Sequence, residues 1–241
     1  MVEGDYIICQ IVIFGRSLYL CNKMLLDSFM HKPSLNIETP CPEQVQYYLE
    51  AWDKQENYVL QEKALDKLFF ETYPNNTDIN DILIKASSLN DFYSTNIFCI
   101  FAVAKHIYSL NIDQRLRKGD LSLVDDIAEI TIGGKSKCFY SFASKYCSHH
   151  EPTLFPIYDY YVEKVLIFFR QADKFCDFDD ADLKKYSDFM SILNAFQEFY
   201  GLSAYNKKDI DRYLWQLGKR YFPRNYKRKT ALSETTRKKR G

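Results

Sequence analysis

The stretch of sequence that decides the fold runs from Leu123 to Leu166 and reads LVDDIAEITIGGKSKCFYSFASKYCSHHEPTLFPIYDYYVEKVL. Apolar residues at helical spacing predict a helix over residues 123–130. Gly133 and Gly134 then permit a tight turn whose backbone amides can face a phosphate. A second helix is expected from Cys138 through Tyr146. The predicted unit is therefore a helix, a glycine turn and a second helix.

A proline-led segment follows this unit and starts another helix. Residues 149–152, His-His-Glu-Pro, predict a break. The segment Phe155-Pro156-Ile157-Tyr158-Asp159 then places an aspartate immediately before a helix expected over residues 160–169. Aspartate is among the preferred residues at this capping position. The sequence thus puts a carboxylate at a helix N-terminus, where the helix dipole favours negative charge.

Helices are also expected on both sides of this region. Gly and Pro are scarce, with 8 and 7 in 241 residues, and sandwiches and barrels need many more special turns. Helical spacing predicts further elements over residues 42–52, 58–70, 79–87, 89–110, 112–117, 183–200 and 207–221. The predicted fold is all-α, a two-lobed helical domain with a helix–hairpin–helix element and a cleft between the lobes.

Composition and charge divide the chain into three parts. Residues 1–32 are expected to be loosely attached, residues 33–222 to form the helical domain, and residues 223–241 to form a basic tail. The net charge of the whole sequence is zero, but from Lys219 onward Glu234 is the one acidic residue among many Lys and Arg. An acidic body with a basic tail suits a polyanionic partner such as DNA, and a merely solvated tail is the alternative.

The cysteine pattern and the hydropathy pattern bear on the compartment. Seven cysteines without paired spacing predict reduced, buried thiols in a cytoplasmic protein. The apolar run over residues 6–14 is too short to span a bilayer. We therefore expect no membrane partner, and we expect the chain to act as a monomer.

Two short motifs that could hold a ligand are incomplete. Gly134-Lys135-Ser136 lacks the earlier glycine of a phosphate-binding loop, because Glu129 stands at that position. Cys147, His149 and His150 have no second pair of ligands at zinc spacing. Neither a metal nor an organic cofactor is expected.

Residues 156–166 follow the pattern Pro–apolar–x–Asp–x–x–Val–x–x–apolar–Leu. With the glycine turn before it, this pattern resembles the helix–hairpin–helix DNA glycosylase superfamily over residues 88–166. Within that superfamily the chain is most similar to archaeal 8-oxoguanine glycosylases and to bacterial relatives, for which phage defence is one setting. The usual Gly–apolar–Gly hairpin is Gly133-Gly134-Lys135 here, and the 22 residues from Lys137 to Asp159 are slightly more than usual.

The resemblance implies roles for several residues. In the family an aspartate stabilises the oxocarbenium-like sugar as the base departs, or orients the attacking group, and Asp159 holds its position. Lys137 holds the position of the nucleophilic lysine of bifunctional members, which forms a Schiff base at the anomeric carbon, while the other hairpin register would favour Lys135. Contacts to the DNA backbone are expected from Gly133, Gly134, Lys135 and Lys145.

A base flipped out of DNA needs an aromatic pocket with polar groups for its edge. The residues expected to supply it are Tyr93, Asn96, Tyr158 and Trp215, for each of which plain core packing is the alternative. The predicted function is excision of a modified or damaged base from DNA by cleavage of its N-glycosidic bond. The alternative is a non-catalytic helical module that binds nucleic acid or another protein.

Overall fold

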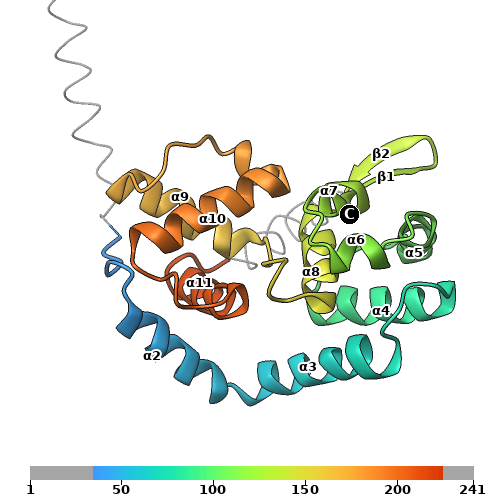
Figure 1. Cartoon of the computed structure of the whole chain (residues 1–241), viewed down its shortest axis with the longest axis horizontal. Coiled ribbons are helices and arrows are strands. Elements are labelled where there is room, and N and C mark those ends of the chain that lie inside the picture. Colours follow the sequence, from blue (N-terminus) through green and yellow to red (C-terminus); the bar gives the residue numbers. More distant parts are fainter. Residues whose placement is uncertain (1–34, 225–241) are drawn as a thin grey trace, which may run out of the picture. The chain divides into compact units, whose positions relative to one another are not determined.

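The computed structural model describes residues 35–224 (Figure 1). Contacts divide the chain into two units, Met1–Glu38 and Thr39–Gly241, and all the described helices and strands belong to the second unit. The predicted loose segment, residues 1–32, lies outside the described residues, as does the predicted tail beyond Arg224.

The described residues form an all-α fold with a single two-stranded sheet, which confirms the predicted fold class. The helices are α2 (Pro42–Asp53), α3 (Glu56–Asp66), α4 (Ile79–Phe92), α5 (Ile100–Ser109), α6 (Asp113–Arg117), α7 (Ser122–Ala128), α8 (Tyr140–His150), α9 (Tyr160–Asp173), α10 (Tyr186–Phe199) and α11 (Lys207–Tyr221). A π-helical turn (η1, Lys67–Thr72) follows α3, and a 3-10 turn (η2, Asp182–Lys184) precedes α10. None of the described helices combines the length and the apolar character that a bilayer crossing requires.

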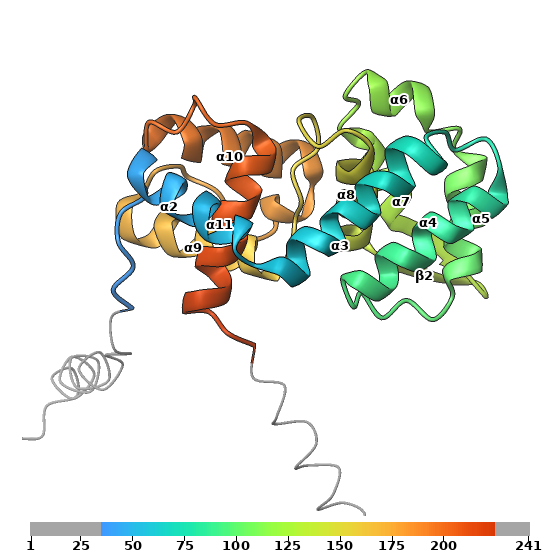
Figure 2. The ribbon, with the colours of Figure 1, turned by 90° about the horizontal axis from the view of Figure 1, so that it is seen from below.

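The helices form two groups (Figures 1 and 2). In the first group, called the N-lobe here, α4 packs against α5 and α8, and α7 packs against α8. In the second group, the C-lobe, α11 packs against both α9 and α2. Helix α3 follows α2 and leads into the N-lobe, so the described part of the chain starts in the C-lobe, forms the N-lobe and then returns to the C-lobe. Bonds between α3 and α11, such as Arg212 Nη2 to Glu62 Oε2 at 2.6 Å, join the lobes.

The prediction of one helix over residues 89–110 is wrong, because the structure has two helices there, separated by a loop. Helix α4 ends at Phe92 and α5 begins at Ile100. The Asn90 side chain explains the break: its Oδ1 accepts hydrogen bonds from Thr95 Oγ1 at 2.6 Å and from the Ile97 amide at 2.9 Å. Short polar side chains that bond to nearby backbone in this way compete with the helix.

The predicted glycine turn connects two strands rather than two helices. Strands β1 (Glu129–Ile132) and β2 (Lys135–Cys138) pair antiparallel, with Ile132 opposite Lys135. Gly133 and Gly134 have φ of 57° and 74°, as a two-residue hairpin turn that follows the strand twist requires. Three consecutive β-branched residues, Ile130-Thr131-Ile132, favour a strand, so the expected helix ends early at Ala128.

The predicted break over residues 149–152 begins too early. Helix α8 runs through His150 and is buried on every side from Phe142 onward. Both histidines form hydrogen bonds inside the N-lobe: His149 bonds to the Tyr93 hydroxyl and His150 to the Asn76 side-chain amide. The expectation of buried thiols holds only for Cys147 among the described cysteines, since the others are half-buried or exposed.

Candidate active site

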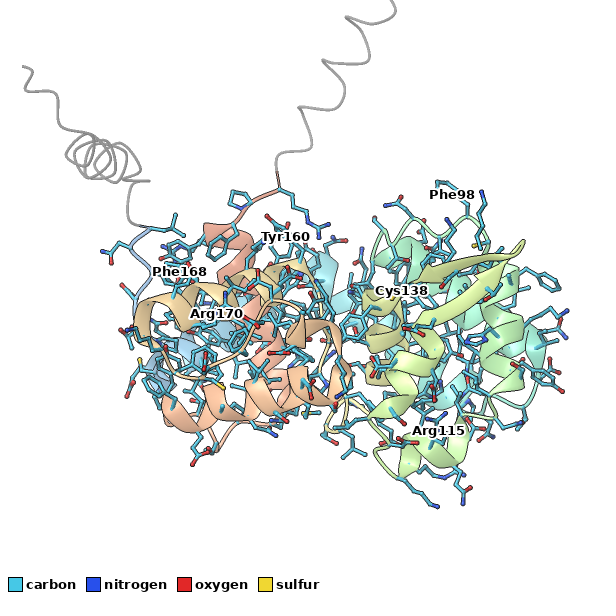
Figure 3. The ribbon with its side chains drawn as sticks, turned by 90° about the horizontal axis from the view of Figure 1, so that it is seen from above. Phe98, Arg115, Cys138, Tyr160, Phe168 and Arg170 are labelled. Atoms are coloured by element: carbon cyan, nitrogen blue, oxygen red, sulfur yellow. The ribbon has the colours of Figure 1, made fainter. Side chains whose placement is uncertain are left out.

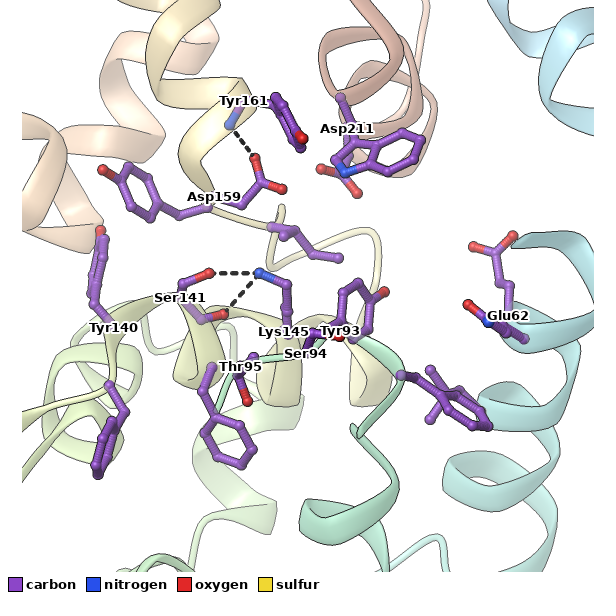
Figure 4. Close-up of a pocket in the computed structure, with 18 of the residues that line it drawn as sticks. Glu62, Tyr93, Ser94, Thr95, Tyr140, Ser141, Lys145, Asp159, Tyr161 and Asp211 are labelled. Carbon is purple, nitrogen blue, oxygen red and sulfur yellow. Dashed lines mark hydrogen bonds between the residues drawn. The ribbon is translucent and has the colours of Figure 1, made fainter. Parts of the chain in front are cut away.

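One pocket of about 670 Å³ opens between the lobes, within the part of the chain that the structure describes. Its walls come from α3, the loop after α4, the first half of α8, the segment before α9, and α11. Figure 4 shows Asp159 and Asp211 reaching into it from the C-lobe, with Lys145 of the N-lobe across from them. The pocket therefore collects ionisable groups from elements far apart in the sequence.

Asp159 caps α9, as the sequence predicts. Its Oδ1 accepts hydrogen bonds from the backbone amides of Tyr161 at 2.8 Å and Val162 at 3.0 Å. Both bonds end on Oδ1. The other oxygen, Oδ2, can therefore interact with a ligand in the pocket that Asp159 lines. The helix terminus fixes the carboxylate in one orientation and adds favourable electrostatics for its charge.

Lys145 is buried, with 4% of its surface exposed, so it is not the DNA-backbone contact predicted from the sequence. Its Nζ donates hydrogen bonds to Ser141 Oγ at 2.6 Å and to the Ser141 carbonyl at 3.2 Å. Burial lowers the pKa of the Lys145 amine below its ordinary value, while the charges of Asp159 and Asp211 act in the opposite direction. A lowered pKa makes the amine easier to deprotonate than that of a solvated lysine.

Asp211 lies on α11 with 9% of its surface exposed. Burial raises the pKa of the Asp211 carboxyl to about 7; Lys208 and Lys145 lower it, whereas Asp159 and Glu62 raise it further. Within the described residues no hydrogen bond to this carboxyl group is formed. A carboxyl with this pKa is protonated part of the time near neutral pH and can then donate a hydrogen bond.

The aromatic ring of Tyr93 lies beneath the Lys145 amine, at 5.2 Å from Nζ to the ring centroid. Its hydroxyl is 2.9 Å from His149 Nε2. Burial lowers the pKa of His149 well below its ordinary value and raises that of Tyr93 well above. The hydrogen bond therefore joins a neutral phenol to a neutral imidazole, and it holds the ring in place under the amine.

The opposite wall is aromatic. Trp52 and Tyr58 stack with centroids 5.9 Å apart, and Trp215 meets Tyr58 edge-on at 5.0 Å. Glu62 lies beside them, and although burial alone would raise its pKa, Lys208 and Arg212 lower it. Flat rings with one paired acid at their edge provide a surface for a planar ligand.

The structure brings together all four residues predicted for the base pocket, with Asp159, but not those of the hairpin. Lining residues that the sequence predicted are Tyr93, Asn96, Tyr158, Asp159 and Trp215. The Tyr158 hydroxyl is bonded to Glu163 and Lys184, so its polar end is already engaged. Lys137, Lys135 and both glycines are exposed on the hairpin and do not line the pocket.

The matching family model is HI_0787_N, described as an N-terminal domain, which covers residues 44–154. A protein of Haemophilus influenzae described as uncharacterized is 51% identical over 152 residues, which make up 63% of this chain and 73% of that protein. The chain belongs to this family. No solved structure matches it. The region matched by the family model contains Tyr93 and Lys145, and the segment after it supplies Asp159 and Asp211.

Sequence reasoning missed the place of Lys145 in the pocket and missed Asp211 altogether. Each lies among residues of a buried helix face: Lys145 between Ala143 and Tyr146 on α8, and Asp211 between Ile210 and Leu214 on α11. A charged residue within a buried stripe is the signal that could have found both. Among the described residues, no three His, Cys, Asp or Glu side chains are grouped so that they could hold a metal ion.

Proposed function

We propose that this protein is a DNA glycosylase that excises a modified base flipped out of DNA. The observation that carries the proposal is a buried lysine amine, Lys145, in one pocket with the helix-capping carboxylate Asp159. A volume of about 670 Å³ is enough for a nucleobase with its sugar. Stacking between aromatic side chains is how enzymes of this class hold an extruded base.

Lys145 takes the nucleophile role that the sequence resemblance gave to Lys137. Its lone pair forms a bond to the anomeric carbon as the bond from that carbon to the base breaks. The base leaves with the electron pair of the broken bond and takes a proton. Loss of a proton from the nitrogen and opening of the sugar ring, with a proton taken up by the ring oxygen, then give a Schiff base.

The two carboxyl groups have different tasks in this proposal. Asp159, held through Oδ1, presents its other oxygen to the positive charge that develops on the sugar. Asp211, when protonated, donates its proton to the departing base or a hydrogen bond to the edge of the base. Two acids with different environments in one pocket are a common arrangement for acid–base chemistry.

The test is excision and borohydride trapping on a panel of duplexes, each with one modified base such as 8-oxoguanine. We expect a trapped covalent adduct with the wild type and none with Lys145→Gln. The control Lys137→Gln, which alters an exposed lysine outside the pocket, should keep the adduct. Asp159→Asn should reduce excision by about a hundredfold or more while DNA binding persists.

Three outcomes would contradict the proposal in different ways. An adduct that survives Lys145→Gln but disappears in Lys137→Gln would return the role to the hairpin. Base release without any adduct would leave a monofunctional enzyme in which water attacks. The absence of excision on every duplex, with DNA still bound, would favour a non-catalytic nucleic-acid-binding module.

A further inference from the structure

Two lysines buried in the N-lobe, Lys85 and Lys145, differ in their hydrogen-bond acceptors. An ammonium group has three N–H bonds to donate. Lys85 Nζ meets three oxygens at 2.8 to 3.0 Å. Within the described part of the chain Lys145 Nζ meets two oxygens, and both belong to Ser141. One N–H position of Lys145 therefore finds no acceptor there.

Helix α8 itself places Ser141 beside the amine. Ser141 lies four residues before Lys145, in the first turn of α8, so the two side chains share one face of the helix. The distances from Nζ are 2.6 Å to Ser141 Oγ and 3.2 Å to the Ser141 carbonyl oxygen. Both residues line the pocket. The serine thus holds two sides of an amine that is open to the pocket.

The charged groups across from the amine come from the other lobe. In Figure 3, Cys138 lies in the N-lobe and Tyr160 in the C-lobe. Ser141 follows the first by three residues, and Asp159 directly precedes the second. In Figure 4 both dashed bonds leave Nζ toward Ser141, while Asp159 and Asp211 lie beyond the amine on C-lobe elements. The remaining position of Nζ is therefore turned away from Ser141 and toward the pocket.

We infer that Ser141 positions the lone pair of the Lys145 amine for attack on the substrate. This inference rests on the proposed function. A lysine amine attacks in its neutral form, which keeps two N–H bonds and one lone pair. When the two N–H bonds are donated to the two oxygens of Ser141, the lone pair occupies the position that faces the pocket. A nucleophile held in one orientation reacts faster than one that rotates freely.

Two other roles for Ser141 lead to different expectations. If its hydroxyl only stabilised the ammonium form, removing it would lower the pKa of Lys145 and leave the reactivity of the neutral amine unchanged. If the hydroxyl donated its own proton to Nζ, it would occupy the lone pair, and removing it would make the amine more reactive. The positioning role alone predicts a neutral amine that reacts more slowly without the hydroxyl.

Groups on other elements also act on the charge of this amine. Burial lowers the pKa of Lys145, Asp159 and Asp211 raise it, and Arg224 lowers it. The ring of Tyr93, 5.2 Å from Nζ, attracts the ammonium form. A variant that changes the Ser141 side chain alone keeps all of these groups. Alanine is also a better helix former than serine, so Ser141→Ala should fold.

The test measures the reactivity of the lysines in the whole protein without DNA. The protein is labelled with formaldehyde and dimethylamine–borane at a series of pH values, and the labelling of Lys145 is followed by mass spectrometry. We expect Ser141→Ala to lower the limiting rate at high pH about tenfold. The half-maximal pH should move down, because the ammonium form loses an acceptor. Ser141→Thr, which keeps a hydroxyl, should restore both, and single-turnover excision should follow the limiting rate.

Ser148→Ala is the matched control, because Ser148 is also a buried serine of α8 but lies outside the pocket lining. An equal fall in this variant, or a fall that Ser141→Thr does not restore, would mean a change in α8 as a whole and would overturn the inference. So would an unchanged or a raised limiting rate in Ser141→Ala. The expected labelling in a protein that excises no base would refute the proposed chemistry alone, whereas excision that Ser141→Ala leaves unchanged would refute the positioning role alone.

Discussion

The buried ionisable residues of this protein differ in how completely they are hydrogen-bonded. The amine of Lys85 donates hydrogen bonds to the carbonyls of Tyr73 and Asn75 and to Asn76 Oδ1, at 2.8 to 3.0 Å, and so joins the end of η1 to α4. Asp211 receives no such set of bonds within the described residues and faces the pocket instead. Completely bonded buried charges stabilise a fold, whereas incompletely bonded ones mark sites where a ligand completes the set.

Asp211 gives a prediction about stability against pH. Its folded-state pKa of about 7 lies above the value of about 3.9 in an unfolded chain. Its contribution to stability is therefore present below pH 4 and is lost as the pH rises to 7. Asp211→Asn should gain about 4 kcal/mol over wild type between pH 4 and pH 8, at about 1.4 kcal/mol for each pKa unit. Urea unfolding at both pH values measures this gain.

Asp209→Asn, on the same helix but outside the pocket lining, is the control for that experiment. An equal pH-dependent gain in the control would show that the effect belongs to α11 as a whole. A wild-type and Asp211→Asn difference that does not change with pH would show that the Asp211 carboxyl is charged in the folded protein at both pH values.

At the scale of elements, local signals predict helix starts well and helix neighbours poorly. Helix α11 has the bounds expected from its sequence, and Asn206 caps it through a bond from the Asp209 amide to its Oδ1 at 3.0 Å. Such caps involve residues two or three apart, so the sequence contains the whole interaction. The break after Phe92 depends on hydrogen bonds from Thr95 and Ile97 to the Asn90 side chain, across the loop between α4 and α5. The spacing of apolar residues does not reveal these bonds.

The sequence predicts the candidate site only in part, because it reveals interactions between residues close in sequence but not the packing of distant ones. Asp159 is a local cap with a motif around it, and the sequence places it correctly. The sequence predicts Lys145 as a contact to the DNA backbone, but the residues of α8 are buried from Phe142 to His150, and Lys145 lies in the pocket. Which face of a helix is covered is decided by the packing of the whole lobe, so neither Lys145 nor Asp211 could be placed from local pattern alone.

The crossing of α9 and α11 gives a prediction at this scale. A Cβ atom on Gly218 would lie 2.6 Å from Tyr161 Cβ and 2.7 Å from the Tyr161 carbonyl oxygen. Gly218→Ala must therefore push the helices apart, at a cost of about 2 kcal/mol. Because the helices carry Asp159 and Asp211, we also expect excision to fall by about tenfold or more. Thermal unfolding and single-turnover excision measure the two effects.

Gly201→Ala is the comparison for that variant. Gly201 has φ of 68° and open space around its α-carbon, so alanine costs about 1 kcal/mol through backbone strain alone. It does not line the pocket, and excision should be unchanged. Similar losses of excision in both variants would mean that activity follows stability, not the spacing of the two carboxylates.

At the scale of the whole molecule, charge is unevenly distributed along a chain whose net charge is zero. Residues 225–241 contain seven Lys and Arg and one Glu, so the remaining residues are acidic on balance. An acidic body is repelled by DNA unless cations are concentrated where the DNA lies. The exposed lysines of the hairpin and the basic C-terminal sequence are two separate sources of such cations.

These two sources lead to the last prediction, which concerns salt. Each lysine or arginine that neutralises a phosphate adds about 0.9 to the slope of log affinity against log salt, because a counterion is released. Lys135→Gln with Lys137→Gln should therefore lower the slope by about 2, and removal of residues 225–241 should lower it further. Excision at saturating protein should stay the same in both variants, since neither change alters a residue that lines the pocket. Anisotropy titrations at several salt concentrations measure the slopes. If both variants keep the wild-type slope, other cations hold the DNA, and Lys184, Lys208 and Arg212 at the pocket become the residues to change next.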